Sequence, residues 1–141
     1  MRETHMSAKD LIQTFLRTME ARDLDTAEAM MADDATIIFP GGKRFSSQRE
    51  MVQAAKGRYQ WVKKTFDHID HYTRDDGAEV VYIMGTLYGV NNHDVAFEGV
   101  RYIDRFVVRD GKITEQHVWN DRAESGVLQR TSDSSAQEQG A

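Results

Sequence analysis

The chain has 141 residues, which is enough for one domain and too few for two ordinary ones. Hydrophobic residues make up 40% and charged residues 29%, a composition typical of a soluble globular protein. A net charge of −5 argues against nucleic acid or an anionic membrane as the main partner, and the lack of cysteine excludes disulfides and a thiolate nucleophile. No apolar run approaches the roughly 20 residues that span a bilayer, and no signal-peptide pattern opens the chain. Because the lack of cysteine also fits a reducing compartment, we expect a cytoplasmic protein.

The chain begins with two predicted helices. Apolar residues recur at helical spacing over Leu11–Met19, and Ser7 and Asp10 stand at capping spacing ahead of them, so the first helix is predicted to start at Ser7 and end near residue 22. Asp25 with Glu28 predicts the capped start of a second, shorter helix that ends by residue 34.

A short strand and a third helix are predicted next. The β-branched, apolar run Ala35–Phe39 predicts a strand, which Pro40 and two glycines bring to an end. Ser47 and Glu50 form a capping box, which predicts the start of a third helix there.

The second half of the chain predicts long antiparallel strands. Turn signals at residues 75–77, 91–92 and 109–111 divide it into strands over about 65–74, 79–90, 95–108 and 112–120. Sequential connections favour a meander, and helices followed by strands indicate an α+β fold. Helices laid on one face of a curved sheet enclose a cone, which is a natural small-molecule pocket. We expect one domain over 7–128 and a mobile polar tail over 129–141.

Two segments resemble the NTF2-like superfamily, which includes SnoaL-type polyketide cyclases, ketosteroid isomerases, limonene-epoxide hydrolases and scytalone dehydratases. They are the run Met31–Gly42 and, far downstream, the run Arg109–Ile113. The resemblance covers about residues 11–121. It implies a cone-shaped fold with three N-terminal helices packed on a strongly curved antiparallel sheet, an apolar pocket, and frequent homodimers.

The ketosteroid isomerases allow a comparison residue by residue. Their general base precedes the strand-ending proline, where this chain has Phe39, and their oxyanion-hole tyrosine corresponds to Phe15. Their second oxyanion-hole group corresponds to Asp104. Because phenylalanine cannot transfer a proton, authentic ketosteroid isomerase chemistry is not expected. Nor do Arg101 and Asp104 reproduce the Arg-x-Asp pattern of the epoxide hydrolases, and Glu20 only stands near the helical acid of the dehydratases.

Asp104 is the leading catalytic candidate. Alternation along its strand places it on one face with apolar residues, which we interpret as the concave face: Val100, Tyr102, Phe106 and Val108. A desolvated acid there would have a raised pKa and could act as a hydrogen-bond donor or a general acid/base. The alternative is a carboxylate that pairs with Arg101 or Arg105 on a solvated strand.

A histidine could complete an acid/base pair with Asp104. His68 and His71 lie on opposite faces of one strand, so only one of them can face the cavity, and we favour His68. The family alignment points Asn120 inward and His117 outward, onto a mixed patch that suggests a homodimer face; a register slip would reverse this and make His117 the better base.

Several aromatic side chains are expected around the ligand. Both faces of the strand over 79–90 are apolar, and we expect Tyr82 and Tyr88 to line the cavity because their hydroxyls suit a ligand, although ordinary core packing is equally compatible. The full predicted ligand-binding set is Phe15, Phe39, Trp61, Tyr82, Tyr88, Tyr102, Phe106 and Asn120.

The sequence carries no nucleotide-binding or nucleophile-elbow motif, and its histidines lack metal-ligand spacing. The Lys63-Lys64 doublet is too short for a nucleic-acid patch. We therefore expect no cofactor and no metal, and predict a cofactor-independent acid/base enzyme of isomerase, cyclase or dehydratase type acting on a hydrophobic small molecule. The alternatives are a non-catalytic small-molecule-binding protein and a dimerisation or docking module.

Overall fold

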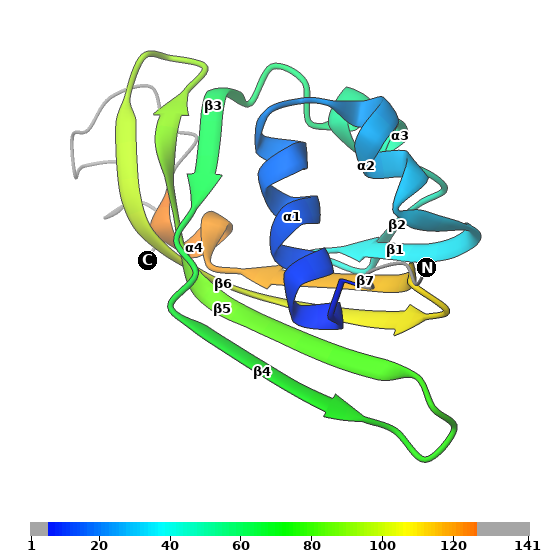
Figure 1. Ribbon diagram of the computed structural model, residues 1–141. Coiled ribbons are helices and arrows are strands. Elements are labelled where there is room, and N and C mark those ends of the chain that lie inside the picture. Colours follow the sequence, from blue (N-terminus) through cyan, green and yellow to red (C-terminus); the bar gives the residue numbers. More distant parts are fainter. Residues whose placement is uncertain (1–5, 127–141) are drawn as a thin grey trace.

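The computed structural model describes residues 6–126 and has an α+β architecture (Figure 1). Its helices are α1 (Ala8–Glu20), α2 (Leu24–Ala29), α3 (Gln48–Ala54) and α4 (Arg122–Ser125). Its strands are β1 (Met31–Phe39), β2 (Lys43–Phe45), β3 (Tyr59–Lys64), β4 (His68–Thr73), β5 (Glu79–Asn91), β6 (Ala96–Arg109) and β7 (Lys112–Asn120). The predicted polar tail over 129–141 lies outside the described residues.

Side-chain caps fix where the helices begin. The Ser7 hydroxyl accepts a hydrogen bond from the amide of Asp10, and the Ser47 hydroxyl accepts one from the amide of Glu50, as the sequence predicts. The predicted cap of α2 is wrong, because Asp23 rather than Asp25 occupies the N-cap position. The left-handed backbone of Arg22 (φ 60°) ends α1, and α2 begins two residues later at Leu24.

The sheet is a meander with a parallel addition. Its strands follow the order β2-β1-β7-β6-β5-β3, and β4 also pairs with β5. The antiparallel path β5-β6-β7 agrees with the turn signals, whereas β1 joins β7 in parallel, which the sequence did not indicate. β1 also starts at Met31 rather than at Ala35, because an irregularity between Met31 and Thr36 lets the exposed Asp33 and Asp34 sit inside the strand.

β3 and β4 share one partner strand. β3 pairs with the second half of β5 and β4 pairs with the first half, so both lie along the same edge of β5. The chain passes from one to the other through an irregular segment at residues 65–67, which we call the crossing, and the amides of Thr65 and Asp67 still donate hydrogen bonds to β5 (Figure 1). This crossing is possible because Gly85 has no side chain: a Cβ atom there would overlap the carbonyl oxygen of Thr65. The sequence predicted one strand over 65–74 and missed both β3 and the three-residue β2.

The main core lies between α1 and the concave face of the sheet. Ile12 and Phe15 of α1 are fully buried there, and the Phe15 ring meets Phe106 of β6 edge-on at 5.8 Å. A smaller cluster of Ala78, Val80 and Val107 packs on the opposite, convex face. Among the described residues, each helix is too short or too polar to cross a membrane.

Candidate functional site

A cavity of about 200 Å³ opens beside the end of α1. Its walls come from α1, α3, the β1–β2 turn, β3 and the inner faces of β5, β6 and β7. Most of the wall is apolar and aromatic, which suits an apolar ligand. Its apolar lining residues are Leu16, Met19, Phe39, Pro40, Phe45, Met51, Ala54, Ala55, Tyr59, Val62, Leu87, Tyr102 and Val118.

A buried ion pair stands at this wall. The Lys64 ammonium of β3 contacts Oδ2 of Asp104 on β6. The Lys64 side chain is 19% exposed and lines the cavity, whereas the Asp104 side chain is 0% exposed and lies behind it. Within residues 6–126, Oδ1 of Asp104 has no hydrogen-bond partner. The Asp104 carboxylate therefore does not line the cavity itself, but it contacts the Lys64 amine, which does.

Burial and the charge of Lys64 shift the pKa of the Asp104 carboxyl in opposite directions. Burial raises the pKa of this carboxyl above its ordinary value, and the Lys64 ammonium offsets only part of that effect. Burial, reinforced by the nearby Asp104 charge, also raises the pKa of the Tyr102 phenol. Tyr102 therefore stays protonated and acts as a hydrogen-bond donor.

Tyr102 and α1 hold Lys64 in place. The Lys64 ammonium lies 4.5 Å from the centre of the Tyr102 ring, and the Tyr102 hydroxyl donates to the carbonyl oxygen of Thr65 at 2.7 Å. From α1, the Glu20 carboxylate accepts from the Lys64 amide at 2.8 Å, while Arg17 donates to the Lys64 carbonyl oxygen at 3.0 Å. Arg17 and Glu20 are themselves joined by an ion pair at 3.0 Å. The backbone of Lys64 is thus fixed on both sides.

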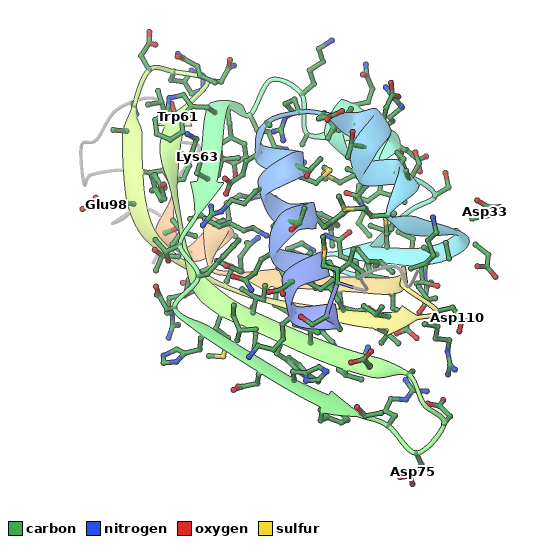
Figure 2. All side chains as sticks on the ribbon, in the orientation of Figure 1. Asp33, Trp61, Lys63, Asp75, Glu98 and Asp110 are labelled. Carbon is green, nitrogen blue, oxygen red and sulfur yellow. The ribbon has the colours of Figure 1, made fainter. Side chains whose placement is uncertain are left out.

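Sequence reasoning did not single out Lys64. The doublet Lys63-Lys64 is too short for a nucleic-acid patch, and its two members point in opposite directions because they are neighbours on a strand. Figure 2 shows Lys63 and Trp61 on the side of β3 away from α1. The signal that could have found Lys64 is its alternation with Trp61, Val62 and Lys63, which gives it the same face as Val62.

Neither predicted histidine lies beside Asp104. His68 is exposed on β4, which leaves the cavity behind after the crossing at residues 65–67. His117 is on the convex face of β7, with its ring 5.6 Å from Trp119 and its Nε2 atom 3.8 Å from the Glu115 carboxylate. Lysine, not histidine, is therefore the partner that the structure gives to Asp104.

The predicted ligand-binding residues divide into three groups. Phe39, Tyr102 and Asn120 line the cavity. Phe15 and Phe106 are buried in the core and do not reach the cavity wall.

The remaining three aromatic residues lie elsewhere, which corrects the expectation that they line the cavity. Tyr82 packs against the convex cluster, Tyr88 meets Trp61 edge-on at 6.0 Å, and Trp61 is 44% exposed. The reason is strand parity, because Leu87 of β5 faces the cavity and the alternate positions therefore face outward.

Two glutamines, Gln48 and Gln116, also line the cavity, and no pattern in the sequence distinguishes them from other glutamines. Gln48 Nε2 donates to Oε1 of Gln116 at 2.7 Å, and both side chains are buried. Within residues 6–126, Oε1 of Gln48 has no hydrogen-bond partner. In the same range, no group of three or more potential ligand side chains is placed to hold a metal ion.

The SnoaL-like domain family matches residues 12–116 of the chain. The chain belongs to this family. Solved structures support the same fold, while comparison with curated proteins found no significant relative.

Among the solved structures, an NTF2-like protein of unknown function from Burkholderia pseudomallei has a TM-score of 0.72 at 12% identity, covering 84% of this chain and 94% of its own. An LEH-like epoxide hydrolase from M. tuberculosis has a TM-score of 0.65 at 23% identity, covering 86% and 89%. A putative polyketide cyclase from Pseudomonas putida has a TM-score of 0.59 at 15% identity, covering 81% and 91%. At these identities the similarity establishes the NTF2-like fold, which hosts many different chemistries.

Proposed function

We propose that this SnoaL-like protein is an acid/base enzyme that moves a proton within a hydrophobic carbonyl compound, in an isomerisation, cyclisation or dehydration. The observation that carries the proposal is the Lys64–Asp104 ion pair. The Asp104 carboxyl is buried outside the cavity wall, and the Lys64 amine that contacts it lines the mostly apolar cavity. Acid/base groups with pKa values shifted by burial are frequent at active sites. Structural neighbours that include a putative polyketide cyclase and an LEH-like epoxide hydrolase are compatible with this class of chemistry.

The pair can accept and return one proton. As the Lys64 nitrogen takes the proton from the carbon next to the substrate carbonyl, one ammonium proton passes to Asp104, and the C–H electron pair becomes part of an enolate. Lys64 is then still an ammonium ion and stabilises the enolate oxygen, while Asp104 is a neutral acid. Reversing the transfer at a different carbon gives the isomer and restores the pair. The raised pKa of the Asp104 carboxyl favours its role as the proton store.

Exchange of carbon-bound hydrogen tests this proposal directly. Apolar ketones would be incubated with the protein in D₂O, and loss of the proton next to the carbonyl followed by NMR. We expect the wild-type protein to accelerate exchange, and the Lys64→Met/Asp104→Asn double variant to lose about 100-fold or more of that acceleration. The double variant is chosen because it removes the amine without leaving a lone carboxylate buried.

Binding is measured alongside, by the shift in unfolding temperature that each ketone causes. Ketones that stabilise the wild-type protein but show no faster exchange would contradict the enzymatic proposal and favour the non-catalytic small-molecule-binding alternative. Equal exchange by the wild-type protein and the double variant would show that the acceleration does not come from the Lys64–Asp104 pair.

A further inference from the structure

The charged side chains around the cavity are mostly cationic, although the whole chain carries a net charge of −5. Glu20 is the one carboxylate among the described lining residues, and Arg17 and the Lys64 amide already hold it. The cationic lining residues are Arg22, Lys43, Arg58, Lys64 and Arg122. The cavity therefore differs in charge from the protein that surrounds it.

Arginines away from the cavity mostly have carboxylate partners. The ion pairs are Arg17–Glu20, Arg49–Asp25, Arg74–Asp76, Arg101–Asp121, Arg105–Glu115 and Arg109–Asp76. By contrast, the cavity-lining Arg22, Arg58 and Arg122 have no carboxylate partner within residues 6–126. Within residues 6–126, Lys64 is thus neutralised by Asp104, whereas the charges of Arg22, Arg58 and Arg122 at the cavity have no carboxylate beside them.

Arg58 and Arg122 are the more informative of these three because they are half-buried. The Arg122 guanidinium donates a long hydrogen bond to the neutral Tyr59 hydroxyl at 3.5 Å. A cation that is partly removed from water without an opposite charge is destabilising. The planar guanidinium fork matches the two oxygens of a carboxylate, so a bound carboxylate would offset that cost.

We propose that the cavity binds a small, mainly apolar carboxylate, whose charged group is held by Arg58 and Arg122. Its apolar body lies against the aromatic and aliphatic wall, with Phe39 and Val62 among the contacts. The volume of about 200 Å³ is below the roughly 300–1,000 Å³ of drug-sized pockets, which limits the body to one or two rings. This inference rests on the proposed function and names the class of its substrate.

Matched neutral and charged probes test the inference. Calorimetry would compare 2-naphthoate with 2-naphthamide, which has nearly the same shape but no charge, and benzoate would serve as a smaller carboxylate. We expect the wild-type protein to bind a carboxylate about tenfold or more tightly than the amide. Arg58→Gln and Arg122→Gln should each weaken carboxylate binding by about tenfold while leaving amide binding unchanged.

Arg44→Gln is the matched control, because Arg44 is an exposed arginine of β2 that does not line the cavity and has no carboxylate partner within residues 6–126. Its substitution should not change either affinity. The inference is overturned if naphthoate and naphthamide bind equally, if Arg44→Gln weakens carboxylate binding as much as Arg58→Gln, or if neither carboxylate binds.

The inference and the proposed function can fail separately. Preferential carboxylate binding without hydrogen exchange in any ketone would leave the anion site standing and remove the enzymatic proposal. Hydrogen exchange without any preference for carboxylates would support the enzymatic proposal and remove the anion site.

Discussion

Asp104 shows how one residue can have a predictable position and an unpredictable partner. Its place on the concave face follows from the alternation of Val100, Tyr102, Phe106 and Val108, all of which are buried as the pattern predicts. Its contact with Lys64 depends on the pairing of β3 and β6 with opposite edges of β5. Local spacing in the sequence does not specify that pairing. The catalytic role of Asp104 stays a prediction.

The raised pKa of the Asp104 carboxyl makes stability depend on pH. The folded state binds this proton more tightly than the unfolded chain, so the contribution of the group is complete below its unfolded pKa of about 3.9. That contribution is lost as the pH rises through the folded pKa. Urea unfolding between pH 4 and pH 8 should therefore show the free energy of unfolding of the wild-type protein falling relative to that of Asp104→Asn.

Asp75→Asn is the control for this measurement, because it makes the same chemical change in an exposed turn (Figure 2). Parallel pH profiles for the wild-type protein and Asp104→Asn would contradict the expected burial effect at Asp104.

At the scale of elements, the crossing between β3 and β4 is what places Lys64. Leu87 pairs with Lys64 at the end of β3, and the chain then passes over Gly85 before β4 begins. The carbonyl oxygen of Thr65, within this crossing, accepts the hydrogen bond from Tyr102. The crossing at residues 65–67 therefore helps to position both Lys64 and Tyr102 at the cavity wall.

Gly85→Ala should displace this crossing. The added methyl group would overlap Thr65, so we expect a loss of about 2 kcal/mol or more in the free energy of unfolding, together with weaker binding of any cavity ligand. Gly99→Ala is the control: its Cβ has open space, and its positive φ of 75° adds only backbone strain of about 1 kcal/mol. Chemical denaturation with thermal-shift binding assays would measure both effects. Equal losses in the two variants would argue against a special role for the crossing.

Long elements with clear end signals were predictable, and short elements that depend on tertiary pairing were not. The serine caps of α1 and α3 and the glycine-containing turns around β5, β6 and β7 act locally, so the sequence carries them. β2 and β3 are too short or too mixed in composition to show a period. The inner face of β5 cannot be predicted from alternation because both faces are apolar, so the expectation that Tyr82 and Tyr88 line the cavity is wrong.

On the whole molecule, an apolar row crosses the convex face of the sheet. Met84 of β5 pairs with Ile103 of β6, and Ile103 pairs with Trp119 of β7, so the three side chains lie side by side. Met84 is 37% exposed and Trp119 is 49% exposed. Exposed apolar surface of this kind favours self-association, and we propose that the protein is a homodimer through this row.

Light scattering after size-exclusion chromatography tests this proposal. We expect a mass roughly twice the 16.1 kDa of the chain, and a shift toward the monomer mass in Trp119→Asp. Trp61→Asp is the matched control, since Trp61 is similarly exposed on β3 but is not part of the row. A monomeric wild-type protein, or dissociation of both variants alike, would rule out this interface.

The parallel pairing of β1 with β7 has a consequence for how the protein is made. β1 is synthesised before β7, yet β7, the last strand of the sheet in chain order, is the strand that pairs with it in parallel. Until Lys112–Asn120 has been synthesised, the edge of β1 that pairs with β7 has no partner, although β1 carries buried apolar side chains such as Ile37. Folding must therefore finish after nearly the whole domain has been translated, and the nascent chain spends that interval with an aggregation-prone edge.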